Sequence, residues 1–118
     1  MALRFQIAIC LCTSILAACT SPSARVAVVK LVQPKTESDC VKSGGEWAKD
    51  FFGGYYCFLR TTDGGKRCTG SEQCQWVCLG PDDAVRGAKV VGACSETNSQ
   101  LGHVVFVEDG KAIVENVE

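Results

Sequence analysis

The sequence predicts a small, disulfide-rich, mainly β fold with a single folded module. Nine cysteines in 118 residues are a density typical of exported chains that disulfides stabilise. Doubled glycines at 44–45, 53–54 and 64–65 mark turns at short intervals, because glycine adopts positive φ freely. Short aromatic and β-branched runs lie between the turns, a pattern typical of strands joined by hairpins.

The first eighteen residues have the layout of a secretory signal peptide. Arg4 and the α-amino group supply positive charge, and the mostly apolar run that follows is shorter than the about 20 residues of a membrane span. The run ends in Leu16-Ala17-Ala18-Cys19, which fits a bacterial lipobox at every position. We therefore expect cleavage before Cys19 and acylation of its thiol with palmitate-type chains. The alternative is an ordinary signal peptide, whose removal would leave Cys19 as a plain thiol.

Residues 19–38 follow as the lipidated cysteine and a tether. Each buried methylene of an acyl chain contributes about 0.8 kcal/mol, so two or three chains hold a protein firmly on a membrane. Thr20 stands where an Asp favours retention at the inner membrane of Gram-negative bacteria, so we expect a periplasmic protein anchored to the outer membrane. Residues 26–32 are β-branched and bounded by prolines, which is consistent with disorder, a weak edge strand or an apolar segment near the membrane.

The charge of the processed chain argues against nucleic acid as a partner. Loss of Arg4 with the signal peptide leaves eleven Lys and Arg against thirteen Asp and Glu, a formal charge of −2. Nucleic-acid binding requires clustered basic side chains, and the sequence contains no such cluster.

The cysteine count becomes even once the anchor is set aside. Cys10 and Cys12 leave with the signal peptide and Cys19 takes the lipid, so six cysteines remain for three disulfides. Six cysteines allow 15 pairings, and the placement of the elements favours Cys40–Cys57, Cys68–Cys78 and Cys74–Cys94. The first bridge would staple an aromatic hairpin, and the other two would fasten the middle loop to the strand that follows it.

The module at 39–118 begins with a hairpin at about 45–60, whose strands meet through the turn at 50–54. Residues 70–78 are ambiguous. The run Thr69-Gly70-Ser71-Glu72 fits the capping box of a short helix, whereas a strand would place Cys74, Trp76 and Cys78 on one face. In either case Cys74 and Cys78 are poorly placed to bond each other.

The second half of the module contains the clearest hairpin. A polar loop at 81–89 leads to a strand at 89–94. Residues 103–117 then form two apolar runs around Asp109-Gly110, and Asp-Gly between such runs is a strong hairpin signal.

The ordered cysteines and glycines resemble a known group. The matching features are Cys40-(x3)-Gly44-Gly45-x-Trp47, Tyr56-Cys57, Asp63-Gly64-Gly65-Lys66-x-Cys68, Glu72-x-Cys74-(x3)-Cys78 and Gly92-x-Cys94. In spacing they resemble a family of small exported cysteine-rich lipoproteins of Proteobacteria, of uncharacterised function. Members of that group carry two further cysteines near the end, where this chain has His103 and Asn116. The resemblance implies no activity, cofactor or partner.

A search for chemistry finds no catalytic or metal-binding pattern. Zinc needs four Cys or His ligands; Cys74, Cys78 and His103 supply three, and an oxidising compartment favours disulfides instead. His103 is the only histidine and lies among valines in an expected strand, which is typical of a surface residue. Asp82 and Asp83 lack the further oxygen ligands that calcium requires. We therefore expect no enzyme activity, no metal and no cofactor.

The aromatic residues of the first hairpin are the one surface that suggests binding. Six lie within twelve residues, and Phe51, Phe52 and Tyr55 fall at or beside the expected tip. They either fill the core or form a recognition loop. We expect a lipid-anchored cell-envelope protein with a non-enzymatic binding or structural role toward an envelope protein or the cell wall. The alternative is a small inhibitor of an exported hydrolase such as a protease or lysozyme, inserting 51–55 or 81–86.

Overall fold

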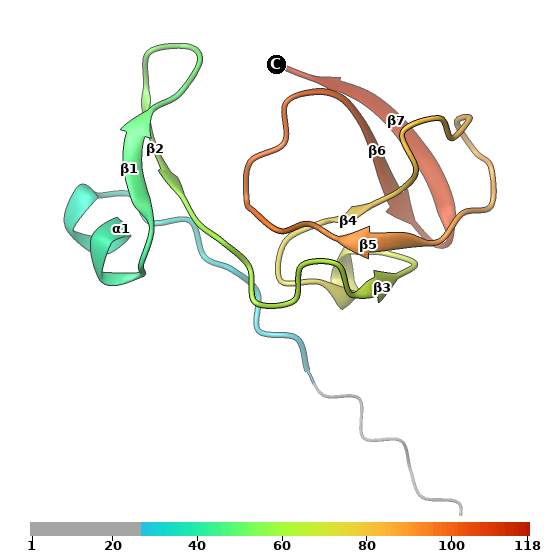
Figure 1. Ribbon diagram of the computed structural model, residues 1–118, viewed down its shortest axis with the longest axis horizontal. Coiled ribbons are helices and arrows are strands. Elements are labelled where there is room, and N and C mark those ends of the chain that lie inside the picture. Colours follow the sequence, from blue (N-terminus) through green and yellow to red (C-terminus); the bar gives the residue numbers. More distant parts are fainter. Residues whose placement is uncertain (1–26) are drawn as a thin grey trace, which may run out of the picture.

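The computed structural model describes residues 27–118. Their fold is small and mainly β, with two antiparallel sheets, one short helix and three disulfides, which confirms the expected fold class. Figure 1 shows the two sheets apart from each other, with an irregular segment of chain running from β2 (Tyr55–Phe58) to β3 (Arg67–Cys68). We call residues 37–59 the hairpin lobe and residues 60–117 the sheet lobe.

The hairpin lobe joins a helix to a two-stranded sheet. Helix α1 (Glu37–Lys42) begins after Thr36, whose hydroxyl accepts a hydrogen bond from the Asp39 amide and so caps it. Strands β1 (Glu46–Lys49) and β2 (Tyr55–Phe58) pair with Trp47 opposite Cys57. The expected hairpin at 45–60 is confirmed. Cys57 is bonded to Cys40 of α1, and this bridge, Leu59, Leu31 and Trp47 form the small core of the lobe.

The sheet lobe contains five antiparallel strands in the order β3-β5-β4-β6-β7. The long hairpin of β6 (Gly102–Glu108) and β7 (Lys111–Val117) confirms the one expected at 103–117. Asp109 and Gly110 both adopt positive φ, at 49° and 71°, as a two-residue turn of this hand requires. The remaining strands are short: β3 is Arg67–Cys68, β4 is Cys78–Leu79 and β5 is Gly92–Cys94.

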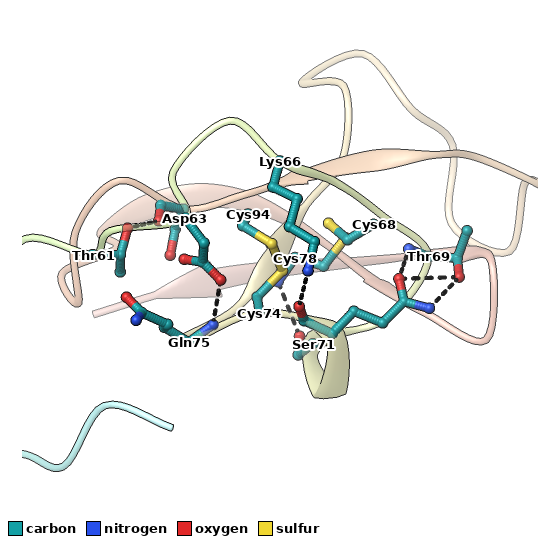
Figure 2. Close-up of a disulfide and its surroundings, with 12 residues drawn as sticks. Thr61, Asp63, Lys66, Cys68, Thr69, Ser71, Cys74, Gln75, Cys78 and Cys94 are labelled. Carbon is teal, nitrogen blue, oxygen red and sulfur yellow. Dashed lines mark hydrogen bonds between the residues drawn. A yellow bond between two sulfur atoms is a disulfide. The ribbon is translucent and has the colours of Figure 1, made fainter. Parts of the chain in front are cut away.

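The core of the sheet lobe consists mostly of disulfides. Cys68–Cys78 and Cys74–Cys94 lie beside each other, and all four half-cystines are buried (Figure 2). Val107 belongs to the same buried cluster. The three pairings are those expected from the sequence. The bridges join β3 to β4 and the loop before β4 to β5, so they fix the register where the strands are too short to do so by themselves.

Residues 70–78 form neither of the two alternatives, a helix or a strand, over their whole length. Only Ser71–Gln73 makes a short 3-10 helix (η1), and no side chain caps it. The Ser71 hydroxyl accepts a hydrogen bond from the Cys78 amide at 3.1 Å instead. Cys74 is already extended, since its bridge to Cys94 and the bridge from Cys78 to Cys68 draw the chain out of a helical path.

The end of the tether contacts the folded module. Residues 27–34 form no strand, but the Leu31 amide donates to the Gln75 carbonyl at 2.9 Å and Lys30 Nζ donates to the Cys74 carbonyl at 2.7 Å. Gln33 Nε2 donates to the Cys57 carbonyl in the hairpin lobe at 3.1 Å. This part of the chain therefore lies between the lobes and contacts both.

Asn98 is the main polar link between the lobes and is only 2% exposed. Its side-chain oxygen accepts from the Leu59 amide at 2.8 Å, and its side-chain nitrogen donates to the Cys57 carbonyl at 2.9 Å and to Gln33 Oε1 at 2.6 Å. Its backbone carbonyl accepts from the Tyr56 hydroxyl at 2.9 Å. Every polar atom of this side chain is therefore satisfied, as burial demands.

Candidate functional site

The loop between β1 and β2 is held by one carboxylate. Asp50 Oδ1 accepts hydrogen bonds from the Phe52 amide at 2.9 Å and the Gly54 amide at 2.7 Å. The Asp50 amide donates to the Gly54 carbonyl, and Gly53 completes the turn with a φ of 83°. These bonds order a five-residue loop whose tip is Phe51 and Phe52.

The two phenylalanines at this tip are exposed. Phe51 is 87% and Phe52 is 69% exposed, with their rings edge to face at 5.8 Å. Of the two alternatives for these rings, core or surface, the structure shows surface. No aromatic side chain is among the fully buried residues of 27–118, because half-cystines and valines fill the cores.

An apolar cleft of about 420 Å³ lies between this loop and the end of the β6–β7 hairpin. Figure 1 shows the loop and the end of β7 at the same end of the molecule. A smaller hollow of about 220 Å³ continues the cleft toward Tyr56, Phe58 and Ser99. The residues that line the larger cleft come from both lobes and are Phe51, Phe52, Leu101, Gly102, Val117 and Glu118.

Tyr55 does not share this cleft. In the hairpin register it is opposite Lys49, and its ring stacks on Trp47 with centroids 6.0 Å apart. Lys49 Nζ lies 5.9 Å from the centre of the Tyr55 ring, within the range of a cation–π contact. The structure thus brings Phe51 and Phe52 together at one surface and places Tyr55 at another.

Two residues of the smaller hollow are linked to the lobe interface. Tyr56 and Phe58 follow Tyr55 on β2 with rings edge to face at 5.2 Å. Burial raises the pKa of the Tyr56 hydroxyl above its ordinary value of 10.0. The hydroxyl therefore stays protonated and donates to the Asn98 carbonyl.

His103 lies on the exposed side of β6 and lines a polar hollow of about 400 Å³. Asp82 and Ser95 line the same hollow, and the Ser95 hydroxyl is buried without a hydrogen-bond partner among residues 27–118. A serine, a histidine and an aspartate thus share one surface. No hydrogen bond in the part of the chain that the structure describes joins His103 to either of the others, so the arrangement of a catalytic triad is not formed.

The sulfurs of Cys68, Cys74 and Cys94 lie within 4.8 Å of one another, close enough for a metal site by distance alone. All three belong to disulfides, and a metal ligand must be a thiolate. Asp63, near this cluster in Figure 2, accepts from the Gln75 amide at 2.7 Å and orders the neighbouring loop. In this oxidised form the cluster is a structural core.

Sequence reasoning missed the residues that complete the cleft. Leu101 is 60% exposed before β6, and Val117 ends β7. No local pattern places either beside Phe51, because their approach depends on how the two lobes meet at Asn98. A single leucine after the polar stretch at 95–100 is the one signal that the sequence offered.

Comparisons with protein families, curated proteins and solved structures found no match to this chain. Cys19, the expected lipid attachment site, lies outside the described residues. From residue 27 onward, no helix has both the length and the apolar character to cross a bilayer.

Proposed function

We propose that this protein is a lipid-anchored cell-envelope protein with a non-enzymatic binding role. The observation that carries the proposal is the pair of exposed rings, Phe51 and Phe52, on an ordered loop above an apolar cleft. Exposed apolar surface is unfavourable in water, and an apolar patch in a cleft is a common sign of a binding site.

The loop is suited to binding because it is already ordered. Asp50 fixes the backbone on both sides of the phenylalanines, so little conformational entropy is lost when a partner covers them. Aromatic residues in such positions dominate many interfaces, because they bring a large area with few rotatable bonds.

The anchor part of the proposal rests on the sequence at Leu16-Ala17-Ala18-Cys19. Among the described residues of the tether, Lys30 is the first that donates a hydrogen bond to the module. Ten residues lie between Cys19 and Lys30, and the eleven Cα-to-Cα steps allow a reach of at most about 40 Å by covalent geometry. A lipid at Cys19 would thus keep the cleft near the membrane surface, where an envelope partner is available.

Capture of partners from envelope extracts tests the binding role. We expect wild-type protein to retain a specific envelope component and the double variant Phe51→Ser/Phe52→Ser to lose it while keeping its fold and disulfides. Val85→Ser is the matched control, because Val85 is also exposed, at 75%, and lies in a different loop. Equal capture by the double variant and wild type would contradict the proposal.

Intact mass of the protein extracted from membranes tests the anchor. Removal of residues 1–18 together with added acyl mass is the expected result, and Cys19→Ser should abolish both. A chain that keeps its first methionine, or that starts at Cys19 without added lipid, would contradict the anchor.

The rigidity of the same loop also favours a second candidate, inhibition of an exported hydrolase. Inhibitor loops resist cleavage because they are held in one conformation, and the Asp50 hydrogen bonds hold residues 50–54 in this way. Assays with a panel of exported proteases and lysozymes separate the candidates. An inhibitor gives stoichiometric loss of hydrolase activity that depends on Phe51, whereas a binding module leaves activity unchanged.

A further inference from the structure

Strand β7 ends the five-stranded sheet, so one of its edges has no neighbouring strand. In the β6–β7 register, Glu108 is opposite Lys111 next to the two-residue turn, and the hydrogen-bonding direction alternates from there. The backbone groups of Ile113, Glu115 and Val117 face β6. Those of Ala112, Val114 and Asn116 face outward.

The loop at 86–90 covers only the first half of that outer edge. The Gly87 amide donates to the Ala112 carbonyl at 2.8 Å, and the Ala112 amide donates to the Ala88 carbonyl at 2.9 Å. Arg86 donates from its guanidinium to the Val114 carbonyl.

Beyond Arg86 the edge is open. Within residues 27–118, the amides of Val114 and Asn116 and the carbonyl of Asn116 have no hydrogen-bond partner. Two outward donors and one outward acceptor in an extended strand are the pattern that another extended chain can pair with.

The apolar cleft lies at the end of this open edge. Val117 belongs both to β7 and to the lining of the cleft, next to Phe51 and Phe52. A chain paired with Asn116 would pass this end of the strand. One of its side chains could then enter the space between Leu101 and the phenylalanines.

The charged residues around the cleft indicate which side chains a bound extended segment would carry there. Glu118 lines the cleft, Asp50 lines the smaller hollow that continues it, and no Lys or Arg is among the described lining residues of either. Arg86 is at the far end of the open edge and is engaged with the Val114 carbonyl. Basic side chains are therefore favoured at the end of a bound segment that reaches the cleft.

We propose that the protein binds an extended peptide segment that pairs with the Val114–Val117 edge of β7, inserts an apolar side chain into the cleft and carries basic residues beside it. This inference rests on the binding role proposed above and adds the chemistry of the partner. Main-chain hydrogen bonds would supply affinity, and the cleft would supply specificity.

The test uses the native processed protein, held in lipid nanodiscs where it is acylated, and a display library of random linear nonapeptides. We expect the selection to enrich peptides in which apolar residues occupy alternate positions and Lys or Arg lies toward one end. On adding an enriched peptide, the amide signals of Val114 and Asn116 should shift in nuclear magnetic resonance spectra and exchange more slowly with solvent.

Asn116→Pro tests the edge directly. Its amide faces outward, so proline removes no hydrogen bond to β6, and an edge strand tolerates it. We expect about tenfold weaker peptide binding, as loss of one hydrogen bond of about 1.4 kcal/mol predicts. Asn116→Thr keeps the amide and is the matched control. An enriched peptide methylated on alternate amides should lose binding to wild type, and this measurement stands even if the proline variant does not fold.

Absence of enrichment, or equal binding of the methylated and unmethylated peptides, would overturn the edge proposal. If the phenylalanine double variant still loses its envelope partner in that case, the binding role survives and only the peptide chemistry is wrong. If the double variant keeps its partner as well, both proposals fail. Enrichment of peptides without basic residues would overturn the charge argument.

Discussion

Replacing Asn98 with alanine tests how the two lobes are held together. The change removes three side-chain hydrogen bonds, two donated and one accepted. The Cys57 carbonyl keeps a partner in Gln33, but the buried Leu59 amide loses its side-chain acceptor. A buried donor without a partner costs about 1–3 kcal/mol, and each of the other bonds contributes about 1 kcal/mol net. We expect the free energy of unfolding to fall by about 3–5 kcal/mol.

Urea unfolding followed by tryptophan fluorescence provides the measurement, because each lobe contains one tryptophan. Trp47 is in the hairpin lobe, and Trp76 is in the sheet lobe, where its ring nitrogen donates to Gln100 at 3.1 Å. Variants with one tryptophan replaced by phenylalanine report each lobe separately. Wild type should show one common transition. In Asn98→Ala the hairpin lobe should unfold at lower urea, because a two-stranded hairpin is marginal by itself.

Ser99→Ala is the control for this experiment. Ser99 is adjacent to Asn98, is partly exposed, and its hydroxyl makes no hydrogen bond within the described chain. Its replacement should change stability by less than about 0.5 kcal/mol. A loss below about 1 kcal/mol for Asn98→Ala, or coincident transitions for both tryptophans in that variant, would refute the assignment of Asn98 as the link between the lobes.

Three further perturbations have defined outcomes. Gly92→Ala should prevent correct pairing of the cysteines, read by thiol labelling, because a Cβ there would lie 2.8 Å from Cys78 Sγ and still closer to the backbone of β4. Cys40→Ser with Cys57→Ser should lower the free energy of unfolding by about 3 kcal/mol, since that bridge closes a loop of 17 residues. The free energy of unfolding should fall as the pH rises above 10.0, because burial raises the pKa of Tyr56 and its protonated state, which stabilises the fold, is lost as the pH passes the folded-state value. Tyr56→Phe should remove this pH-dependent loss. A tyrosinate absorbance titration in which both tyrosines have ordinary pKa values would contradict the prediction.

The parts of the fold that depend on local signals were predictable from the sequence. Asp109-Gly110 between two apolar runs specifies its own hairpin, because both residues accept positive φ. The pairing of Cys40 with Cys57 follows from a hairpin that lies beside the segment containing Cys40. In each case the signal lies within about twenty residues of the structure it determines.

Residues 70–78 show why other parts were not predictable. The capping pattern at 69–72 favours a helix locally, but the chain forms only η1 because Cys74 and Cys78 are bonded to strands elsewhere. A covalent bridge outweighs a capping preference of about 1 kcal/mol. The cleft was hidden because Val117 and Phe51 belong to different lobes, which meet through the contacts that Asn98 and the end of the tether make.

The disulfides explain why this chain can leave its aromatic rings on the surface. A module this small buries little apolar area, and an ordinary fold would place its phenylalanines inside. Here all six cysteines of the module are at most 3% exposed and occupy the centres of both cores. Since cross-links stabilise the fold mainly by restricting the unfolded chain, the folded state needs less apolar burial. Phe51 and Phe52 are thereby free to face solvent, which is where a binding role requires them.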